Sequence, residues 1–125
     1  MIYLASPYTC DDSDKMIVNN VQGERYRFAL WAAACIMRDV GPCFSPIAHS
    51  HPIAMTFELP ADFNWYGYDD WYLDRCNRVY VLQLDGWKES KGVQYEIERS
   101  IAHNIPITYC KFVGDRLRCS DEPIE

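Results

Sequence analysis

The sequence predicts an α/β fold: a doubly wound, mainly parallel sheet of four to five strands with helices on both faces, of the Rossmann or flavodoxin-like type. Short apolar runs alternate with helical stretches along the chain, and such alternation favours a parallel sheet whose crossover connections are the helices. Hydrophobic residues make up 49% of the 125 residues, which is enough for a core on both faces. The length fits one domain, residues 1–125.

The predicted strands are short runs bounded by turn residues such as Ser6-Pro7 and Gly41-Pro42. Arg78 to Leu82 is the clearest of them, because it is rich in β-branched and aromatic residues. The last run in the chain is expected to be an edge strand. In chain order the predicted strands are 2–5, 43–44, 78–82, 105–109 and 116–119.

Helices are predicted between these strands. The first follows a polar loop rich in capping residues, runs to about Arg38 and ends before Gly41-Pro42. Its expected core stripe is Val21, Phe28, Ala32, Cys35 and Ile36. A second helix is expected from about 65 to 76, and a third from the cap Ser90 to about 103. Residues 47–60 give no clear pattern and leave room for one short helix.

Composition narrows the class of partner. The net charge of −6 gives no general attraction for nucleic acid polymers or anionic lipid, and no apolar run is long enough for a membrane span. The chain opens directly in an apolar strand segment, so we expect a cytoplasmic protein that binds a small molecule. No cysteine pair has C-x-x-C spacing, and Cys35, Cys76 and Cys110 are expected to be buried, reduced thiols.

Topology directs attention to two loops. In open parallel sheets the ligand lies at the carboxyl ends of the strands, where the strand order switches. The loop after the first strand contains Ser6, Pro7 and Tyr8, and the loop after the clearest strand covers 83–90. We therefore expect the ligand between these loops.

The second loop leads into Ser90-x-Gly92-x-x-x-Glu96. Ser90 is expected to cap a helix whose free N–H groups can bind an oxygen-rich ligand. Gly92 and Glu96 are four residues apart and share a helix face, with the Glu96 side chain leaning over position 92. This arrangement suits a sugar ring approached by a carboxylate. The simpler interpretation is a solvated glutamate in a second helical turn.

Asp69 supplies a second carboxylate, near the start of the preceding helix. Alone, it would be explained by the helix dipole. Glycosyl transfer, however, needs two carboxyl groups: one attacks the anomeric carbon, and the other donates a proton to the leaving group. The aromatic neighbours Tyr68 and Trp71 could raise the pKa of Asp69 by desolvation.

These stretches together resemble the nucleoside 2-deoxyribosyltransferase family and the related 2'-deoxynucleoside 5'-phosphate N-hydrolases. The similarity is closest to a small bacterial and phage subfamily with the motifs L-A-S-P-Y, S-P-I-x-H-S-H-P and G-W-x-x-S-x-G-x-x-x-E, and it covers residues 2 to about 109. The resemblance implies Glu96 as nucleophile, Asp69 in proton transfer, and substrate contacts from 6–8, Ser90 and Gly92. It also implies a homo-oligomer, a dimer or tetramer, and no cofactor. No arginine follows Ser6, where the phosphate-binding hydrolases carry one.

The remaining candidates are weaker. His49 and His51 would point the same way only in an extended chain, and no third metal ligand is apparent, so no metal is expected. A contact with the substrate base, or a turn held by Ser50 and Pro52, explains them as well. Tyr8 could contact the substrate or Glu96, or leave its hydroxyl in water. The aromatic segment 57–72 is the expected subunit interface.

The sequence therefore predicts cleavage or transfer of the N-glycosidic bond of a nucleoside or nucleotide through a glycosyl ester on Glu96. Two alternatives stay open. One is a nucleotide-binding or sensing module without turnover. The other is an NAD-type glycohydrolase, which only analogy of fold supports.

Overall fold

The computed structural model describes residues 1–56, 58–60 and 62–125. Within them the chain forms a five-stranded sheet in the order β2-β1-β3-β4-β5, in which β4 and β5 pair antiparallel and the other neighbours pair parallel. The predicted α/β class is confirmed. The strands are β1 (Ile2–Ala5), β2 (Cys43–Phe44), β3 (Arg78–Leu82), β4 (Ile107–Val113) and β5 (Arg116–Ser120). The helices are α1 (Lys15–Asp39), α2 (Pro46–Thr56), α3 (Trp65–Leu73) and α4 (Lys91–Ala102).

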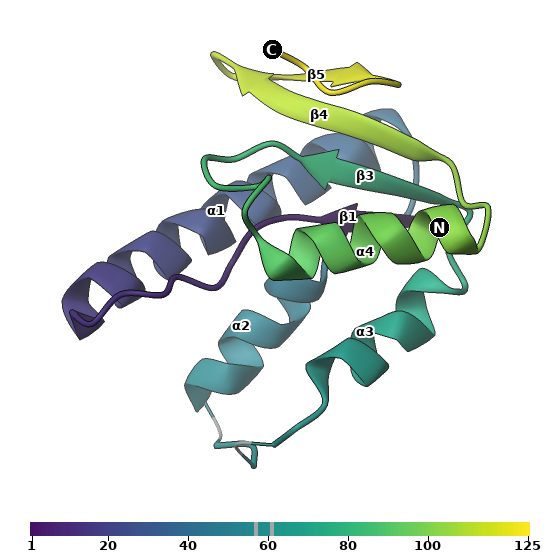
Figure 1. Ribbon diagram of the computed structural model, residues 1–125. Coiled ribbons are helices and arrows are strands. Elements are labelled where there is room, and N and C mark those ends of the chain that lie inside the picture. Colours follow the sequence, from purple (N-terminus) through teal and green to yellow (C-terminus); the bar gives the residue numbers. More distant parts are fainter. Residues whose placement is uncertain (57, 61) are drawn as a thin grey trace.

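Helices cover the sheet on both faces, with α1 on one side and α3 and α4 on the other (Figure 1). Alternate residues of each strand enter the two cores: Leu4 packs with the α1 side and Tyr3 with the α3 and α4 side. All four residues of β1 are buried. This two-sided burial explains why the strands read as continuous apolar runs without polar alternation.

The strand order reverses between β1 and β3. The chain leaves β1 through α1 to reach β2 on one side, and it leaves β3 through α4 to reach β4 on the other. Tyr3 lies opposite Val79 and Ala5 opposite Val81, so both strands end at the same edge. The two loops that follow them therefore start side by side, at the switch point where such sheets bind ligands.

Helix α1 begins where Asp14 caps it: the Met16 N–H donates to Asp14 Oδ1 at 2.9 Å. The expected core residues Ala32, Cys35 and Ile36 are buried. Val21 and Phe28 are only half-buried, which corrects the predicted stripe. The N-terminal part of the helix, which contains Val21, extends beyond the sheet edge (Figure 1), whereas Phe28 packs against Phe112 of β4.

Three boundaries differ from the prediction. The expected turn at Ser50 and Pro52 is wrong, because α2 is helical through both; Ser45 begins it by accepting the Ala48 N–H at 3.1 Å. Helix α3 ends at Leu73 rather than Cys76. Strand β4 begins at Ile107 and extends to Val113, since its second half pairs with β5. Local sequence could not show this partner.

In the described ranges, none of the helices combines the length and hydrophobicity that crossing a membrane requires. Cys35, Cys76 and Cys110 are buried thiols, as expected.

Candidate functional site

The two suspected loops are joined at the carboxyl edge of the sheet by Arg25 of α1. Its guanidinium donates to the backbone carbonyls of Thr9, at 2.9 Å, and Asp85, at 3.0 Å. Gly86 follows with φ +87°, and a Cβ there would lie 2.9 Å from Arg25 Nη2. Glycine is thus required at 86 both for its backbone conformation and for the approach of the arginine. Sequence reasoning missed Arg25, because an arginine early in a long helix resembles a solvated one.

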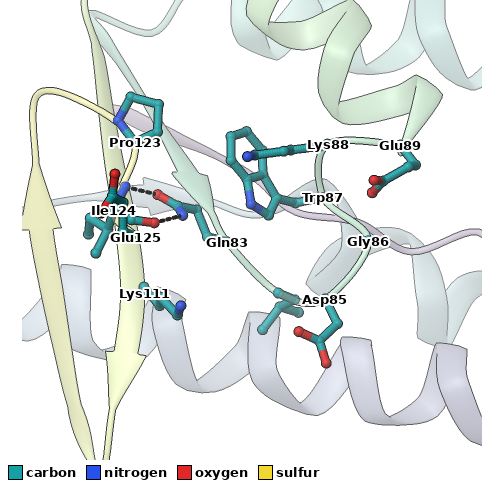
Figure 2. A pocket seen from close by; sticks show the side chains of 11 residues that line it. Gln83, Asp85, Gly86, Trp87, Lys88, Glu89, Lys111, Pro123, Ile124 and Glu125 are labelled. Atoms are coloured by element: carbon teal, nitrogen blue, oxygen red, sulfur yellow. Dashed lines mark hydrogen bonds between the residues drawn. The ribbon is translucent and has the colours of Figure 1, made fainter.

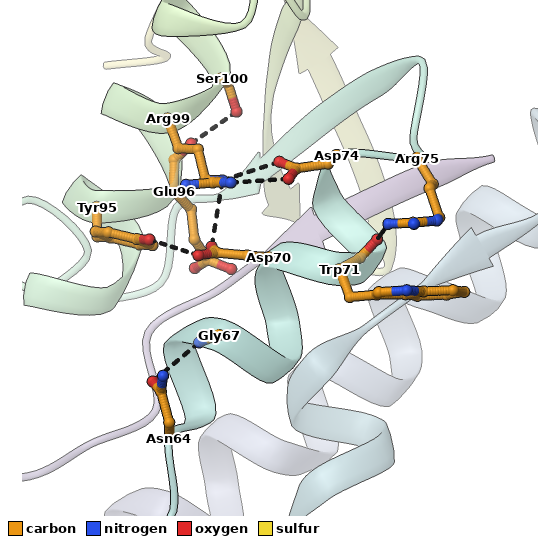
Figure 3. Close-up of polar contacts among 10 residues, drawn as sticks. All are labelled: Asn64, Gly67, Asp70, Trp71, Asp74, Arg75, Tyr95, Glu96, Arg99 and Ser100. Atoms are coloured by element: carbon orange, nitrogen blue, oxygen red, sulfur yellow. Dashed lines mark hydrogen bonds and ion pairs between the residues drawn. The ribbon is translucent and has the colours of Figure 1, made fainter.

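Helix α4 positions Glu96. Ser90 caps the helix as expected, and its hydroxyl accepts the Val93 N–H at 3.3 Å. Val93 and Ser100, three residues before and four after Glu96, are both buried. Glu96 therefore lies on the inward side of α4, and Figure 3 shows it extending toward α3. Burial raises the pKa of Glu96 to about 8, so the solvated interpretation does not apply.

Asp69 of α3 lies in the same environment. Burial, and then the charge of Asp70, raise the pKa of Asp69 to about 7. The charge of Asp69 in turn raises the pKa of Glu96. Asp69 Oδ1 is buried and finds no hydrogen-bond partner among the described residues. The two predicted carboxyl groups are thus near enough for the charge of one to act on the other, and Asp69 keeps one acceptor oxygen for a ligand.

Tyr3 of β1 is a third member of this group that sequence reasoning missed. Its side chain is fully buried on the α3 and α4 face. The Tyr3 hydroxyl has no hydrogen-bond partner of ordinary geometry in the described part of the chain, yet it is near enough to Glu96 to lower the pKa of that carboxyl. A tyrosine inside an otherwise apolar strand was the available signal, since a buried phenol needs a polar partner.

Gly92 leaves open space beside this group. Of the described atoms outside its own helical surroundings, a Cβ at 92 would meet only Ser90 Oγ, at 4.0 Å. Packing of the free protein therefore does not explain the glycine. A ligand lying against the first turn of α4 would explain it.

Gly92→Ala should separate these explanations. We expect the free energy of unfolding to stay equal or to rise by up to about 1 kcal/mol, because alanine favours helix. Turnover or binding of the substrate should fall about tenfold or more, because the methyl group fills the open space. Urea unfolding and steady-state kinetics, with the exposed neighbour variant Lys91→Ala as control, would measure both. Unchanged kinetics in Gly92→Ala would place the ligand elsewhere.

The first loop, 6–8, is buried at its start and half-buried at Tyr8. Ser6 and Pro7 are buried, and the Ser6 hydroxyl is unpartnered within the described ranges. The Tyr8 hydroxyl lies 2.5 Å from His51 Nδ1, and Tyr8 is half-buried. The expected contact of Tyr8 with the substrate stays a prediction. Ser6 stays a candidate for substrate contact.

The two histidines point to different sides of α2, because two helical residues two apart diverge. His49 Nε2 lies 2.7 Å from the Tyr68 hydroxyl of α3, whereas the His51 ring stacks on Tyr26 of α1 at 4.2 Å. Burial lowers the pKa of His51. The two rings cannot ligate one metal ion together, and each forms part of the packing of α2 against its neighbours.

The aromatic segment 57–72 mostly packs internally. Phe44 of β2 stacks on Tyr72 at 4.0 Å between ring centroids, and Tyr66 packs edge-on against Tyr95 of α4. Trp71 is more than half exposed, but Arg75 lies over its ring. Positions 57 and 61 of the segment fall outside the described residues. The expectation of a subunit interface here stays a prediction.

A hollow of about 490 Å³ lies on the other side of the second loop. Figure 2 shows its floor: the Gln83 amide donates to the Ile124 carbonyl at 2.7 Å and accepts the Ile124 N–H at 2.8 Å. Trp87 and Lys88 form one wall. Neither Glu96 nor Asp69 lines this hollow. It is therefore a feature of the loop and the tail at 123–125, distinct from the carboxyl pair.

One family profile matches most of the chain. The sequence profile described as "Domain of unknown function (DUF1937)" matches residues 1–111. The chain belongs to the DUF1937 family. The DUF1937 match includes Tyr3, Asp69 and Glu96 and ends within β4. No curated protein matches the chain. Since the family description assigns no activity, the resemblance to the deoxyribosyltransferases stays a prediction.

Proposed function

We propose that this DUF1937 protein cleaves or transfers the N-glycosidic bond of a nucleoside or nucleotide. The observation that carries the proposal is the pair of inward-facing carboxyl groups, Asp69 and Glu96, whose pKa values are raised to about 7 and about 8. Between these values the pair holds one proton. One protonated and one ionised carboxyl group are what glycosyl transfer through a covalent intermediate requires.

The proposed roles follow from position. Glu96 attacks C1' of the sugar while the C1'–N bond breaks. The electron pair of the C1'–N bond leaves with the base. Asp69 donates the proton that the departing base takes up. Water or a second base then attacks C1', Asp69 recovers a proton, and Glu96 returns as a carboxylate.

Substrate binding adjusts which carboxyl group holds the shared proton. In the empty site the pKa values of both Glu96 and Asp69 are raised, so either carboxyl group can hold the proton. A sugar places the partial positive charge of its anomeric carbon against Glu96, which favours the ionised form of that residue. The proton then moves to Asp69, where the leaving group needs it.

The remaining contacts are assigned by geometry. The open first turn of α4 at Gly92 and the unpartnered hydroxyl of Ser6 are proposed to hold the sugar or its 5' end. Ser90 keeps the turn in place through its cap bond. Trp65 and Tyr66 of α3 lie near Asp69 in sequence and are the proposed neighbours of the base.

A panel of deoxynucleosides, ribonucleosides and their 5'-monophosphates tests the proposal, with released base measured by chromatography. A 2-fluoro-substituted nucleoside should leave a glycosyl ester that adds its mass to the peptide containing Glu96. Saturable binding of a panel member without product would show a binding module instead. Release of nicotinamide from NAD would show a glycohydrolase of a different substrate class.

A further inference from the structure

A polar network beside the carboxyl pair joins α3 to α4. The Tyr95 hydroxyl donates to Asp70 Oδ2 at 2.7 Å. Arg99 forms two bonds to Asp74, at 2.9 and 2.7 Å, and its Nε lies 3.4 Å from Asp70 Oδ1 (Figure 3). The network thus pairs Asp70 of α3 and Asp74, the residue that caps the end of α3, with Tyr95 and Arg99 of α4. It therefore fixes both the spacing and the rotation of the helices.

The network residues are sequence neighbours of the proposed reacting groups. Asp70 follows Asp69, and Tyr95 precedes Glu96. A bond between Asp70 and Tyr95 therefore holds the backbone on either side of the pair. The side chains of Asp70 and Arg99 are 18% and 27% exposed. They lie at the edge of the packing between the helices, so the hydrophobic core does not require them.

The network carries a net negative charge. Arg99 provides one positive charge, and Asp70 and Asp74 provide two negative ones. Asp70 acts on Asp69, Glu96 and Tyr3 alike, because its charge raises the pKa of all three. Asp74 does not act on these three groups; it acts through its ion pair with Arg99.

We infer that Asp70 is a positioning residue for the carboxyl pair: held by Tyr95 and Arg99, it fixes α3 against α4 with Asp69 and Glu96 in one site. The role in catalysis that this inference gives to Asp70 rests on the proposed function, whereas the positioning itself rests on the hydrogen bonds and ion pairs described above. The titratable groups around the pair are Tyr3 from β1, Asp70 from α3, Asp74 at the C-terminal cap of α3, and Tyr95 and Arg99 from α4.

Asp70→Asn and Asp74→Asn form a matched test. Each removes one carboxylate from the same network, but only Asp70 lies electrostatically close to the pair. Carboxyl-carbon NMR titration of the full chain, with signals assigned through Asp69→Asn and Glu96→Gln, measures the midpoints directly. We expect Asp70→Asn to lower the midpoints of both Asp69 and Glu96 by about half a pH unit or more, and Asp74→Asn to leave them in place.

Catalysis supplies a second readout where a substrate is found. The ionised Glu96 sets the acidic limb of the rate profile and the protonated Asp69 sets the basic limb, so both limbs should move to lower pH in Asp70→Asn. A loss of rate with unmoved limbs, or equal shifts in both variants, would reduce Asp70 to a structural role and overturn the inference. The NMR result stands even if no nucleoside is cleaved, so the two proposals fail separately.

Tyr95→Phe is the variant to titrate if Asp70→Asn does not fold. It keeps the ring that packs on Tyr66 and removes only the hydroxyl that donates to Asp70. The dipole of that hydroxyl then no longer offsets the Asp70 charge, and the midpoints of Asp69 and Glu96 should move to higher pH. Unmoved midpoints in this variant would contradict the inference.

Discussion

Glu96→Gln should reduce the release of base by about a thousandfold or more, because the amide cannot attack C1' and no other carboxylate can replace the nucleophile in place. The substitution conserves shape, so the first turn of α4 and the open space at Gly92 stay available. Substrate binding should survive, which makes the loss appear in kcat rather than in KM. Single-turnover assays on the nucleoside that the wild-type protein cleaves best would measure it.

Glu98→Gln is the matched control, since it makes the same change two residues along α4 at an exposed position. Its rate should equal that of the wild type. Trapping with the 2-fluoro-substituted nucleoside should label the wild-type protein and Glu98→Gln but leave Glu96→Gln unlabelled. Retained turnover in Glu96→Gln would exclude the glycosyl ester as an intermediate, and with it the proposed mechanism.

The same Glu96→Gln substitution should stabilise the folded protein, and the gain should grow with pH. The pKa of Glu96 is raised from 4.5 to about 8 on folding, mainly by burial. The unfolded chain therefore releases the proton near pH 4.5, whereas the folded chain keeps it until about pH 8. Wild-type stability falls between these values as pH rises, and a glutamine has no proton to lose.

We expect the difference in the free energy of unfolding between Glu96→Gln and wild type to increase by about 2 to 4 kcal/mol from pH 5 to pH 9. Burying the amide has a cost in free energy that does not change with pH. The change of the stability difference with pH is therefore independent of that cost. Urea unfolding at closely spaced pH values measures it, and Glu98→Gln should show no such trend. A difference that is flat with pH would mean that the Glu96 carboxyl is solvated, contrary to its place between α3 and α4.

Together these two results would give one residue opposite effects on turnover and on stability. A buried carboxyl that must ionise to react is maintained at a cost to the fold, and functional sites are where such costs are retained. A purely structural glutamate would lose stability on substitution.

Much of the fold was predictable from local sequence, because β1 and β3 are buried almost throughout. The run Ile2 to Ala5 and the run Arg78 to Leu82 needed no partner to be recognised, and Ser90 marked the start of α4 through its own side chain. The candidate carboxylates, Asp69 and Glu96, could be named by their spacing from these elements. Local rules suffice where a residue's state depends on its neighbours along the chain.

The tertiary structure alone decided which side chains meet. The hydroxyl of Tyr3 beside Glu96, the guanidinium of Arg25 between two loops, and the hydrogen bonds of Asp70 all join residues far apart in sequence. It also separated His49 from His51 by making α2 a helix through Pro52. Burial and charge at a site are sums over such distant neighbours, so the raised pKa values of the two carboxyl groups follow from the packing of β1, α3 and α4 rather than from either residue's place in the chain.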